Sequence, residues 1–367
     1  MKKIVKILVV MLLAVITTLS MVACSTSTST GSEKGLLYKK IGGQYTIYKY
    51  VDEGLGVTEL DISKVLGTEI KDVRIKANAF SGNNTLTKII VPDTVTLIDK
   101  GAFSGMQCLQ ELVVPFIGMT SIADAEYSPV EQEGKSIKSE RTIAHFFGND
   151  SYDNGASVTI SYDGTTADSE ICYMPLSFKK LTINATSDYA IPMYAFSGLN
   201  KQIDIVLEGK ITAIGEGAFK DASQLRSIVI PNTVTKIYKD AFNNCAKLTN
   251  VTFSTNLETI GEGAFKGAVI SDLVLPQSVK TIGDYAFMNS NVKNVTLSAS
   301  LETIGAYAFY NSIKLEKVYT DGVASTMTIG AFAFSKCDAL VKFDAKSVEE
   351  NKLNYKGFVY NSTAFDK

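Results

Sequence analysis

The apolar positions of this chain follow one pattern that returns at nearly constant intervals. Between Phe80 and Phe334 the dipeptide Ala-Phe recurs in steps of 22 to 25 residues, apart from one step of 93. An apolar residue stands five positions before each of these phenylalanines, which are Phe80, Phe103, Phe196, Phe219, Phe242, Phe265, Phe287, Phe309 and Phe334, and before Phe358 of a degenerate tenth copy. Self-similarity at a fixed period indicates one array of stacked repeats. The length of 367 residues, taken alone, would instead suggest two or three domains.

Between successive phenylalanines, apolar residues alternate as they do in a short strand with one buried face. The pattern is Leu-x-x-Ile-x-Val, followed by proline in several copies, and copies begin at Leu86, Leu225, Leu248, Ile270, Val292 and Leu315. The i, i+2 apolar pair predicts a strand, and a following proline ends it because its nitrogen cannot donate to the ladder. The Ile-Gly-x-x-Ala-Phe segment that comes next predicts a tight corner. No repeat can bury its own Ile, Leu and Phe side chains alone, so stacking is expected to create one continuous core.

This repeat resembles the bacterial leucine-rich repeat of BspA-like surface proteins over roughly residues 75–358, most closely over 191–334. The resemblance implies a leucine-rich-repeat solenoid with α/β-type repeats, made mostly of short parallel β-strands with turns and short helical or 3-10 segments. It implies an N-terminal capping hairpin over 37–70 and regular repeats over 71–115. Irregular repeats with a loop insert are expected over 116–190, and further repeats with a degenerate C-terminal copy over 191–367.

The first 24 residues follow a different pattern. Three lysines precede an apolar run over 7–16, which is too short to cross a bilayer as a helix of ~20 residues. Small residues ending in Ala23 come directly before Cys24, which is typical of a secretory signal and resembles the lipobox of bacterial lipoproteins. We predict that residues 1–23 are a lipoprotein signal peptide and that 24–36 hold the lipidated Cys24 and a polar tether. The alternative is an ordinary cleaved signal with an accidental cysteine.

Composition excludes several classes of function. The chain has 36 Lys+Arg against 38 Asp+Glu, without the basic excess that neutralises phosphates, so we expect no nucleic-acid partner. Loss of residues 1–23 removes three lysines and makes the net charge −5, which argues against binding anionic lipid through the folded body. The chain has one His and no Trp, and one His cannot build a His-rich metal site. We therefore predict no metal, no cofactor and no catalytic residue.

Four cysteines remain after Cys24. Cys245 and Cys337 each lie three residues after a repeat phenylalanine, where other copies have Ala or Ser, so we expect them to be small buried residues. Four repeats at ~4.8 Å each separate them by about 20 Å, whereas a disulfide needs Cα atoms within ~7 Å. Cys108 and Cys172 flank the irregular stretch, and a bridge between these two stays open.

Three weaker candidates for chemistry each have a structural interpretation. His145 has no second His or nucleophile motif nearby, so a turn or core-edge histidine is favoured over a general base or metal ligand. The Gly-Glu-Gly triplets at 215–217 and 261–263 lack the third glycine of a dinucleotide site and coincide with the repeat corner. Residues 150–155 faintly resemble a calcium loop, but Tyr152 stands where a ligand oxygen is needed. An enzyme would require a carboxylate pair in the irregular region.

The residue between the two buried positions of each strand is expected to point outward. Read along the array, this column contains the apolar residues Ile90, Val113, Val206, Val229, Val274 and Tyr319, interspersed with Thr182, Thr252, Thr296 and Asp344. Aligned strands would turn the column into a binding face. The alternative is that β-branched residues are present simply because they suit any strand.

These patterns together predict a non-enzymatic lipoprotein that is exported, anchored to the bacterial membrane through Cys24 and exposed at the cell surface. Its solenoid is expected to bind a protein ligand. The resemblance to BspA-like proteins implies adhesion to host extracellular-matrix proteins or to proteins of neighbouring cells. The alternative is capture of a carbohydrate or another solute, with surface tyrosines such as Tyr285 and Tyr307 serving as aromatic platforms in the absence of tryptophan.

Overall fold

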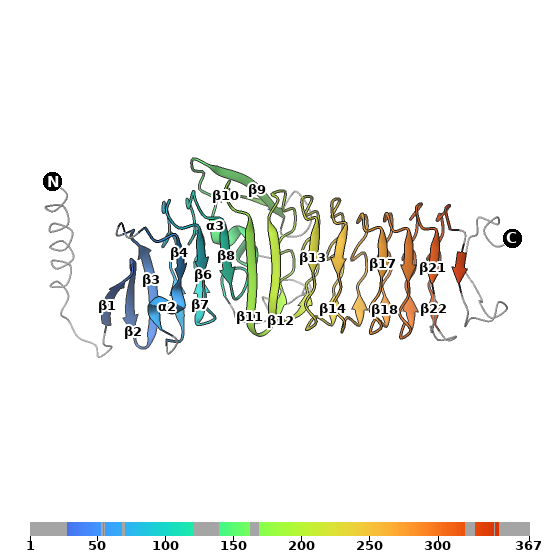
Figure 1. Cartoon of the computed structure of the whole chain (residues 1–367), viewed down its shortest axis with the longest axis horizontal. Helices are drawn as coiled ribbons and strands as arrows, with labels where there is room; N and C mark the ends of the chain where they lie inside the picture. Colours follow the sequence, from blue (N-terminus) through green and yellow to red (C-terminus); the bar gives the residue numbers. More distant parts are fainter. Residues whose placement is uncertain are drawn as a thin grey trace.

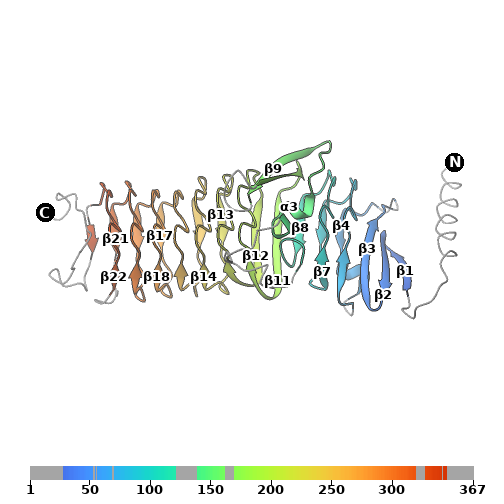
Figure 2. The ribbon, with the colours of Figure 1, turned by 180° about the vertical axis from the view of Figure 1, so that it is seen from behind.

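The computed structural model is an elongated rod in which successive turns of chain stack along one axis (Figure 1; Figure 2). It describes residues 28–344 except 53, 55, 68–69, 121–138, 162–168, 320–326 and 341. The predicted signal peptide, Cys24 and the degenerate copy near Phe358 lie outside the described residues. The N-terminal strands stand at one end of the rod and the last described repeats at the other.

Each regular turn contributes two short strands and a strand-free return. The strand predicted from the i, i+2 pattern, here called the first strand, is β6 (Lys88–Ile90), β8 (Glu111–Val114), β13 (Ser227–Val229), β15 (Asn250–Thr252), β17 (Asp272–Val274), β19 (Asn294–Thr296), β21 (Lys317–Tyr319) and β23 (Lys342–Asp344). Strand β4 (Glu59–Asp61), within the range expected to be the capping hairpin, pairs with β6 and joins this set. The segment predicted as a tight corner opens with a second strand, which is β5 (Val73–Ile75), β7 (Val95–Ile98), β14 (Lys236–Ile237), β16 (Thr259–Ile260), β18 (Thr281–Ile282), β20 (Thr303–Ile304) and β22 (Thr328–Ile329). Parallel pairing joins neighbouring turns in both sets.

Two long strands at the middle of the rod join the two sets. Strand β11 (Lys180–Ile191) pairs with β8 through its first half, and β12 (Asp204–Ile214) pairs with β14 through its last residues. One ten-stranded sheet therefore runs β22-β20-β18-β16-β14-β12-β11-β8-β6-β4, while β13-β15 and β17-β19-β21-β23 form two separate sheets. The second strands keep strict register, with Ile237, Ile260 and Ile282 in consecutive turns facing one another.

The N-terminal end is antiparallel. Strands β1 (Thr28–Glu33), β2 (Leu36–Ile41) and β3 (Gln44–Tyr50) pair in sequence, and β3 then pairs in parallel with β5 of the first turn. Strand β1 lies within the stretch expected to be a tether, so the structure orders part of that polar segment against β2. The short helix α2 (Ile62–Leu66) follows β4, and the side chain of Asp61 caps it by accepting a hydrogen bond from Ser63 N.

The irregular region adds an antiparallel hairpin beside the stack. A 3-10 helix, η2 (Ser139–Arg141), and the one-turn helix α3 (Ala144–Phe147) precede the paired strands β9 (Gly155–Ser161) and β10 (Ser169–Pro175). The hairpin rises from the rod above β11 and β12 (Figure 1). Its inward side chains Val158, Ile160, Cys172 and Met174 are buried in the common core.

The repeat phenylalanines form a ladder inside the rod. From Phe196 to Phe334, the ring centroids of neighbouring turns lie 4.8 to 5.4 Å apart and the ring planes within 11° of parallel. Ladder residues such as Phe265 are fully buried. Burial of a Phe side chain contributes about 1.5–3 kcal/mol, so each ring of the ladder adds to the cohesion between turns. The parallel β-solenoid predicted from the repeat pattern is thereby confirmed.

The four described cysteines are free thiols. Cys245 and Cys337 are buried at the small-residue position, as predicted, and each thiol approaches a backbone carbonyl of the preceding turn at 3.0 and 3.1 Å. Burial raises the pKa of the Cys172 thiol to about 12. Cys108 and Cys172 do not form the bridge that the sequence left open.

Candidate functional site

The column proposed as a binding face lies on the first strands. Strand pairing brings its members together in three registered runs, which are Ile90, Val113, Thr182 and Val206, then Val229 and Thr252, then Val274, Thr296, Tyr319 and Asp344. In the first run Thr182 lies between Val113 and Val206, and in the third run Thr296 lies between Val274 and Tyr319. Thr182 is buried in β11, contrary to the outward position expected for it, so the column is a mixed apolar and hydroxyl surface only on either side of this strand.

Exposure differs strongly along this column. Val229 and Val274 have 62% and 67% of their surface exposed, which is high for valine in a strand. Ile90, Val113 and Val206 are half-buried, as is Tyr319. The two exposed valines therefore mark the part of the column that is most available to a partner.

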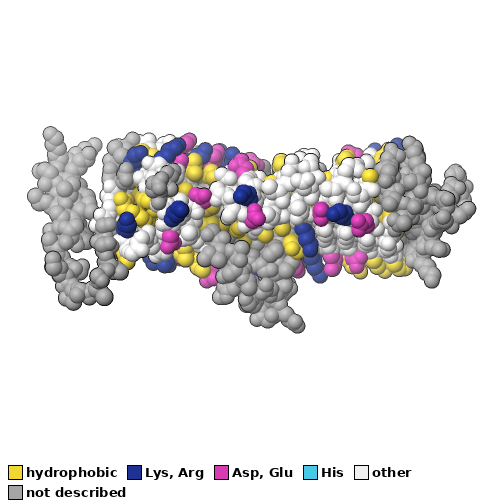
Figure 3. Space-filling model, turned by 90° about the horizontal axis from the view of Figure 1, so that it is seen from below, with side chains coloured by type: hydrophobic (Ala, Val, Ile, Leu, Met, Phe, Trp, Pro, Cys, Tyr) yellow, Lys and Arg dark blue, Asp and Glu magenta, His cyan; other side chains and the backbone are white. Residues whose placement is uncertain are grey.

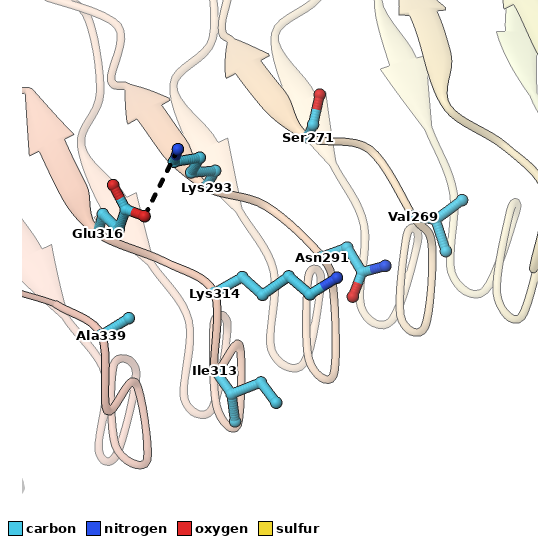
Figure 4. A pocket seen from close by; sticks show the side chains of 8 residues that line it. All are labelled: Val269, Ser271, Asn291, Lys293, Ile313, Lys314, Glu316 and Ala339. Carbon is cyan, nitrogen blue, oxygen red and sulfur yellow. Dashed lines mark ion pairs between the residues drawn. The ribbon is translucent and has the colours of Figure 1, made fainter.

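A hollow of about 540 Å³ opens in the C-terminal half of the rod, where two consecutive turns are shorter than their neighbours (Figure 4). The steps from Phe265 to Phe287 and from Phe287 to Phe309 are 22 residues long, whereas the three preceding steps are 23. The missing residue falls in the turn before the first strand, because Ile270 comes five positions after its phenylalanine and Leu248 comes six. Val269 and Asn291, which line the hollow, belong to these two shortened turns. The step length of 22 was the sequence signal for this hollow, which the search for chemical motifs missed.

The wall of the hollow combines apolar and polar groups. Val269, Ile313 and Ala339 provide the apolar part, and Ser271 and Asn291 add a hydroxyl and an amide. Across the wall, Lys293 forms an ion pair with Glu316 at 3.6 Å, drawn as the dashed line in Figure 4. Ser271, Lys293 and Glu316 directly precede β17, β19 and β21, so the hollow adjoins the strands that carry Val274 and Tyr319.

Lys314 at the hollow has lost a partner that its counterpart keeps. Lys247, which also stands five residues after its repeat phenylalanine, donates to Gln224 Oε1 of the preceding turn at 2.7 Å. In the shortened turn before Lys314, Asn291 directly precedes the first-strand residue Val292, as Gln224 precedes Leu225, but no hydrogen bond joins Asn291 to Lys314 among the described residues. The Lys314 side chain instead extends toward Asn291 (Figure 4).

Other charges on the rod are arranged in pairs between neighbouring turns. Lys239 lies 3.2 Å from Glu262, and Lys280 lies 3.0 Å from Glu258. On the face seen in Figure 3, basic and acidic side chains are interspersed rather than gathered by sign. Exposed pairs of this kind contribute at most about 1 kcal/mol each, so they position the surface charge more than they stabilise the fold.

His145, the single histidine, is a core residue. It lies in α3, is almost completely buried and its Nε2 stands 2.8 Å from the carbonyl oxygen of Ile98. Burial lowers the pKa of His145 below its ordinary value, so the ring is neutral and donates from Nε2. Its Nδ1 is buried and has no hydrogen-bond partner among the residues that the structure describes. The hydrogen bond to Ile98 ties α3 to the neighbouring turn, and this accounts for the histidine structurally.

The remaining sequence candidates for chemistry lie apart from one another. Residues 261–263 form the corner after β16, where a Cβ on Gly261 would come within 2.7 Å of the Tyr238 carbonyl carbon. Close approach of the preceding turn therefore explains this glycine. Within the described ranges, no three His, Cys, Asp or Glu side chains are grouped as metal ligands. No helix in the described part of the chain has the length and apolar character to span a membrane.

Comparison of the sequence with protein-family models identifies the repeat. The BspA-type leucine-rich repeat region matches in six copies, over residues 73–147, 165–291 and 258–363. The chain belongs to this family. The BspA-type assignment also confirms the leucine-rich-repeat solenoid predicted from the sequence. No curated protein shows significant similarity to the chain.

Solved structures similar to this BspA-type protein are bacterial leucine-rich repeat proteins. One from Eubacterium ventriosum is 18% identical, with 89% of this chain and 99% of that chain covered and a TM-score of 0.41. One from Bacteroides ovatus is 18% identical, with coverages of 88% and 81% and a TM-score of 0.38. A leucine-rich cell surface protein from Faecalibacterium prausnitzii is 17% identical, with coverages of 91% and 99% and a TM-score of 0.31.

Three aromatic residues occupy one position of the BspA-type repeat in consecutive turns. Tyr285, Tyr307 and Phe332 each lie two residues before the ladder phenylalanine, with φ of 57° or 58°, where other turns have Gly217 and Gly263. The rings of Tyr285 and Tyr307 are 5.2 Å apart and 9° from parallel. Because each ring covers a face of the other, no sugar ring fits between them. Tyr285 keeps 36% of its surface exposed, and the equivalent position of the preceding turn holds Gly263, so the carbohydrate alternative stays a prediction.

Proposed function

We propose that this chain is a non-enzymatic bacterial surface lipoprotein that binds other proteins through the first-strand face of its solenoid. The observation that carries the proposal is the registered column with the exposed side chains of Val229 and Val274. Extended surfaces of aligned repeats are what solenoid proteins use for binding, and exposed apolar residues supply contact area. Host extracellular-matrix proteins and proteins of neighbouring cells are the proposed ligands.

Two further features support the non-enzymatic part and the anchoring part of the proposal. The single histidine is used in a buried contact with the Ile98 backbone, so it offers no general base at a surface cleft. Ala23-Cys24 provides the residues for lipidation, and β1 begins only four residues after Cys24. The lipid would hold the N-terminal end of the rod at the membrane and leave the repeats facing outward.

Binding of the lipid-free body, residues 25–367, to immobilised extracellular-matrix proteins and to intact bacterial cells tests the proposal. We expect saturable binding to at least one of these surfaces. The double variant Val229→Lys with Val274→Lys is expected to weaken it tenfold or more, because two desolvated charges replace apolar contacts.

Leu176→Lys is the matched control, since Leu176 is 61% exposed but lies on the loop after β10, away from the column. This control should bind as the unmodified chain does. Equal loss in both variants, or no binding to any matrix protein or cell, would contradict the proposal.

A further inference from the structure

We infer that the hollow over the two 22-residue turns is a docking site for an acidic, extended segment of the partner protein. In this arrangement a carboxylate meets the ammonium group of Lys314, and an adjoining apolar side chain packs against Ile313 and Val269. The inference rests on the proposed protein-binding function and specifies where on the rod, and for what chemistry, that function operates.

Charge at the hollow selects an acidic ligand. The wall carries two ammonium groups and one carboxylate, and the carboxylate of Glu316 is already paired with Lys293 at 3.6 Å. Lys314 stands where the equivalent Lys247 bonds to Gln224, but its own neighbouring turn has the shorter Asn291, and no hydrogen bond joins these two side chains in the described part of the chain. A partner carboxylate would give Lys314 a side-chain contact in place of the one that Lys247 makes with Gln224. Hydrogen bonds between charged groups are the stronger ones in proteins.

Shape and apolar surface favour an extended chain. The lining residues Val269, Asn291, Ile313 and Ala339 come from four successive turns. Three steps of ~4.8 Å between these turns give about 14 Å, the length of roughly four residues of extended chain. Ile313 is 54% exposed and presents an isolated apolar contact at the rim. The amide of Asn291 and the hydroxyl of Ser271 are positioned to bond the backbone of such a segment.

The hollow also lies beside the proposed binding face. It opens immediately before β17, β19 and β21, the strands that carry Val274 and Tyr319. A partner that covers the exposed Val274 could therefore extend an acidic segment into the hollow without a second interface. The two features would form one continuous contact surface on the C-terminal half of the rod.

An array of ten-residue peptides tests this inference directly. Each peptide carries two Glu and two Leu residues at varied spacings in a Gly/Ser background, and a matched set carries Gln in place of Glu. The tightest Glu peptide is then labelled with fluorescein and titrated with the lipid-free body by fluorescence anisotropy. We expect saturable binding, at least tenfold weaker binding of the Gln peptide, and further weakening in higher salt.

Two variants of the protein locate the binding. Lys314→Gln should weaken the Glu peptide about tenfold, while the matched control Lys247→Gln should change its affinity less than twofold. Insertion of one alanine between Asn291 and Val292 restores a 23-residue turn and should abolish peptide binding. Circular dichroism and a thermal melt of this insertion variant verify that the solenoid is intact. If the insertion variant is misfolded, the comparison of Lys314→Gln with Lys247→Gln tests whether the peptide binds at the hollow.

The outcomes separate this inference from the proposed function. Equal losses in the two lysine variants, or no saturable binding by any Glu peptide, would overturn the hollow as an acidic docking site. Retained binding to matrix proteins or cells in that case would leave the strand-face proposal standing. Tighter binding of glucuronate than of the peptides would assign the hollow to an anionic sugar and overturn the peptide assignment. The double valine variant should bind the Glu peptide with unchanged affinity, since the residues that line the hollow are the same.

Discussion

The environment of His145 makes its protonation unfavourable in the folded chain. The ring is buried, burial lowers its pKa, and Nε2 already donates to the Ile98 carbonyl oxygen. The unfolded chain takes up a proton at about pH 6.5, above the pKa of the folded chain. Between these two values the unfolded state binds more protons, so the stabilising contribution is complete above about pH 6.5 and is lost as the pH falls.

We therefore expect the urea concentration at the midpoint of unfolding to decrease when the pH is lowered from 7.5 to 5.0. The variant His145→Gln should be less stable at pH 7.5 but should lack the histidine-dependent part of this change. Because the chain has no other histidine, the difference between the two proteins isolates one group. The same pH dependence in both proteins would show that His145 is not responsible.

The corner between a second strand and the phenylalanine ladder depends on Gly261. A Cβ at this position would meet backbone atoms of the preceding turn, at 2.7 Å from the carbonyl carbon of Tyr238 and 2.8 Å from Lys239 N. Backbone atoms cannot move aside as the end of a side chain can. We expect Gly261→Ala to destabilise the fold by about 1–3 kcal/mol, measured by urea unfolding followed by circular dichroism.

Gly267 provides the matched control in the same turn. Its φ is 73°, and a Cβ would come no closer than 3.7 Å to another residue. Asn244 and Asn289 hold the equivalent position in neighbouring turns with φ of 59° and 57°. Gly267→Asn should therefore change the free energy of unfolding by less than about 0.5 kcal/mol. Similar losses at Gly261 and Gly267 would contradict a role for close approach between turns.

The repeat made most strands predictable because each core position recurs in many copies along the sequence. The i, i+2 pairs located the first strands, and Ala-Phe located the ladder. The sequence pattern did not reveal β1 (Thr28–Glu33), because its polar residues have no apolar alternation and it is ordered by pairing with β2. The hairpin β9–β10 was expected only as loops, since its alternating Val158, Ile160, Cys172 and Met174 interrupt the repeat.

The candidate site was predictable only in part, for a related reason. Alternation along a strand shows that Val229 points outward, but it does not give the 62% exposure, which depends on neighbouring turns. The hollow includes two turns that are each one residue shorter than the turns before them. A motif defined by the residues that are present does not detect a residue that is missing. Lys314 becomes distinctive only when it is compared with Lys247 and Gln224 in a regular turn.

The whole molecule is a rod with the predicted lipid at its N-terminal end, and the most exposed part of the proposed binding face, at Val229 and Val274, lies farther along the axis. Strand β1 begins at Thr28, so three residues separate it from Cys24 and reach about 10–11 Å when extended. The antiparallel strands β1–β3 would therefore stand close to the membrane. Strands β17 and β21, which adjoin the hollow and carry Val274 and Tyr319, lie toward the C-terminal end of the rod (Figure 1). This geometry suits a protein that meets its partners away from the membrane surface.

Anchoring of this rod is predicted to depend on Cys24 alone. Its acyl chains supply the membrane affinity, since each buried CH₂ contributes ~0.8 kcal/mol and several chains together hold a protein stably. In cells that express the full chain, Cys24→Ser should move the protein from the detergent phase to the aqueous phase of a Triton X-114 partition. It should also abolish incorporation of a clickable palmitate analogue. Cys108→Ser, which removes a free thiol of the solenoid, should leave both readouts unchanged. Retention of the Cys24→Ser protein in the detergent phase would instead place the anchor elsewhere in the chain.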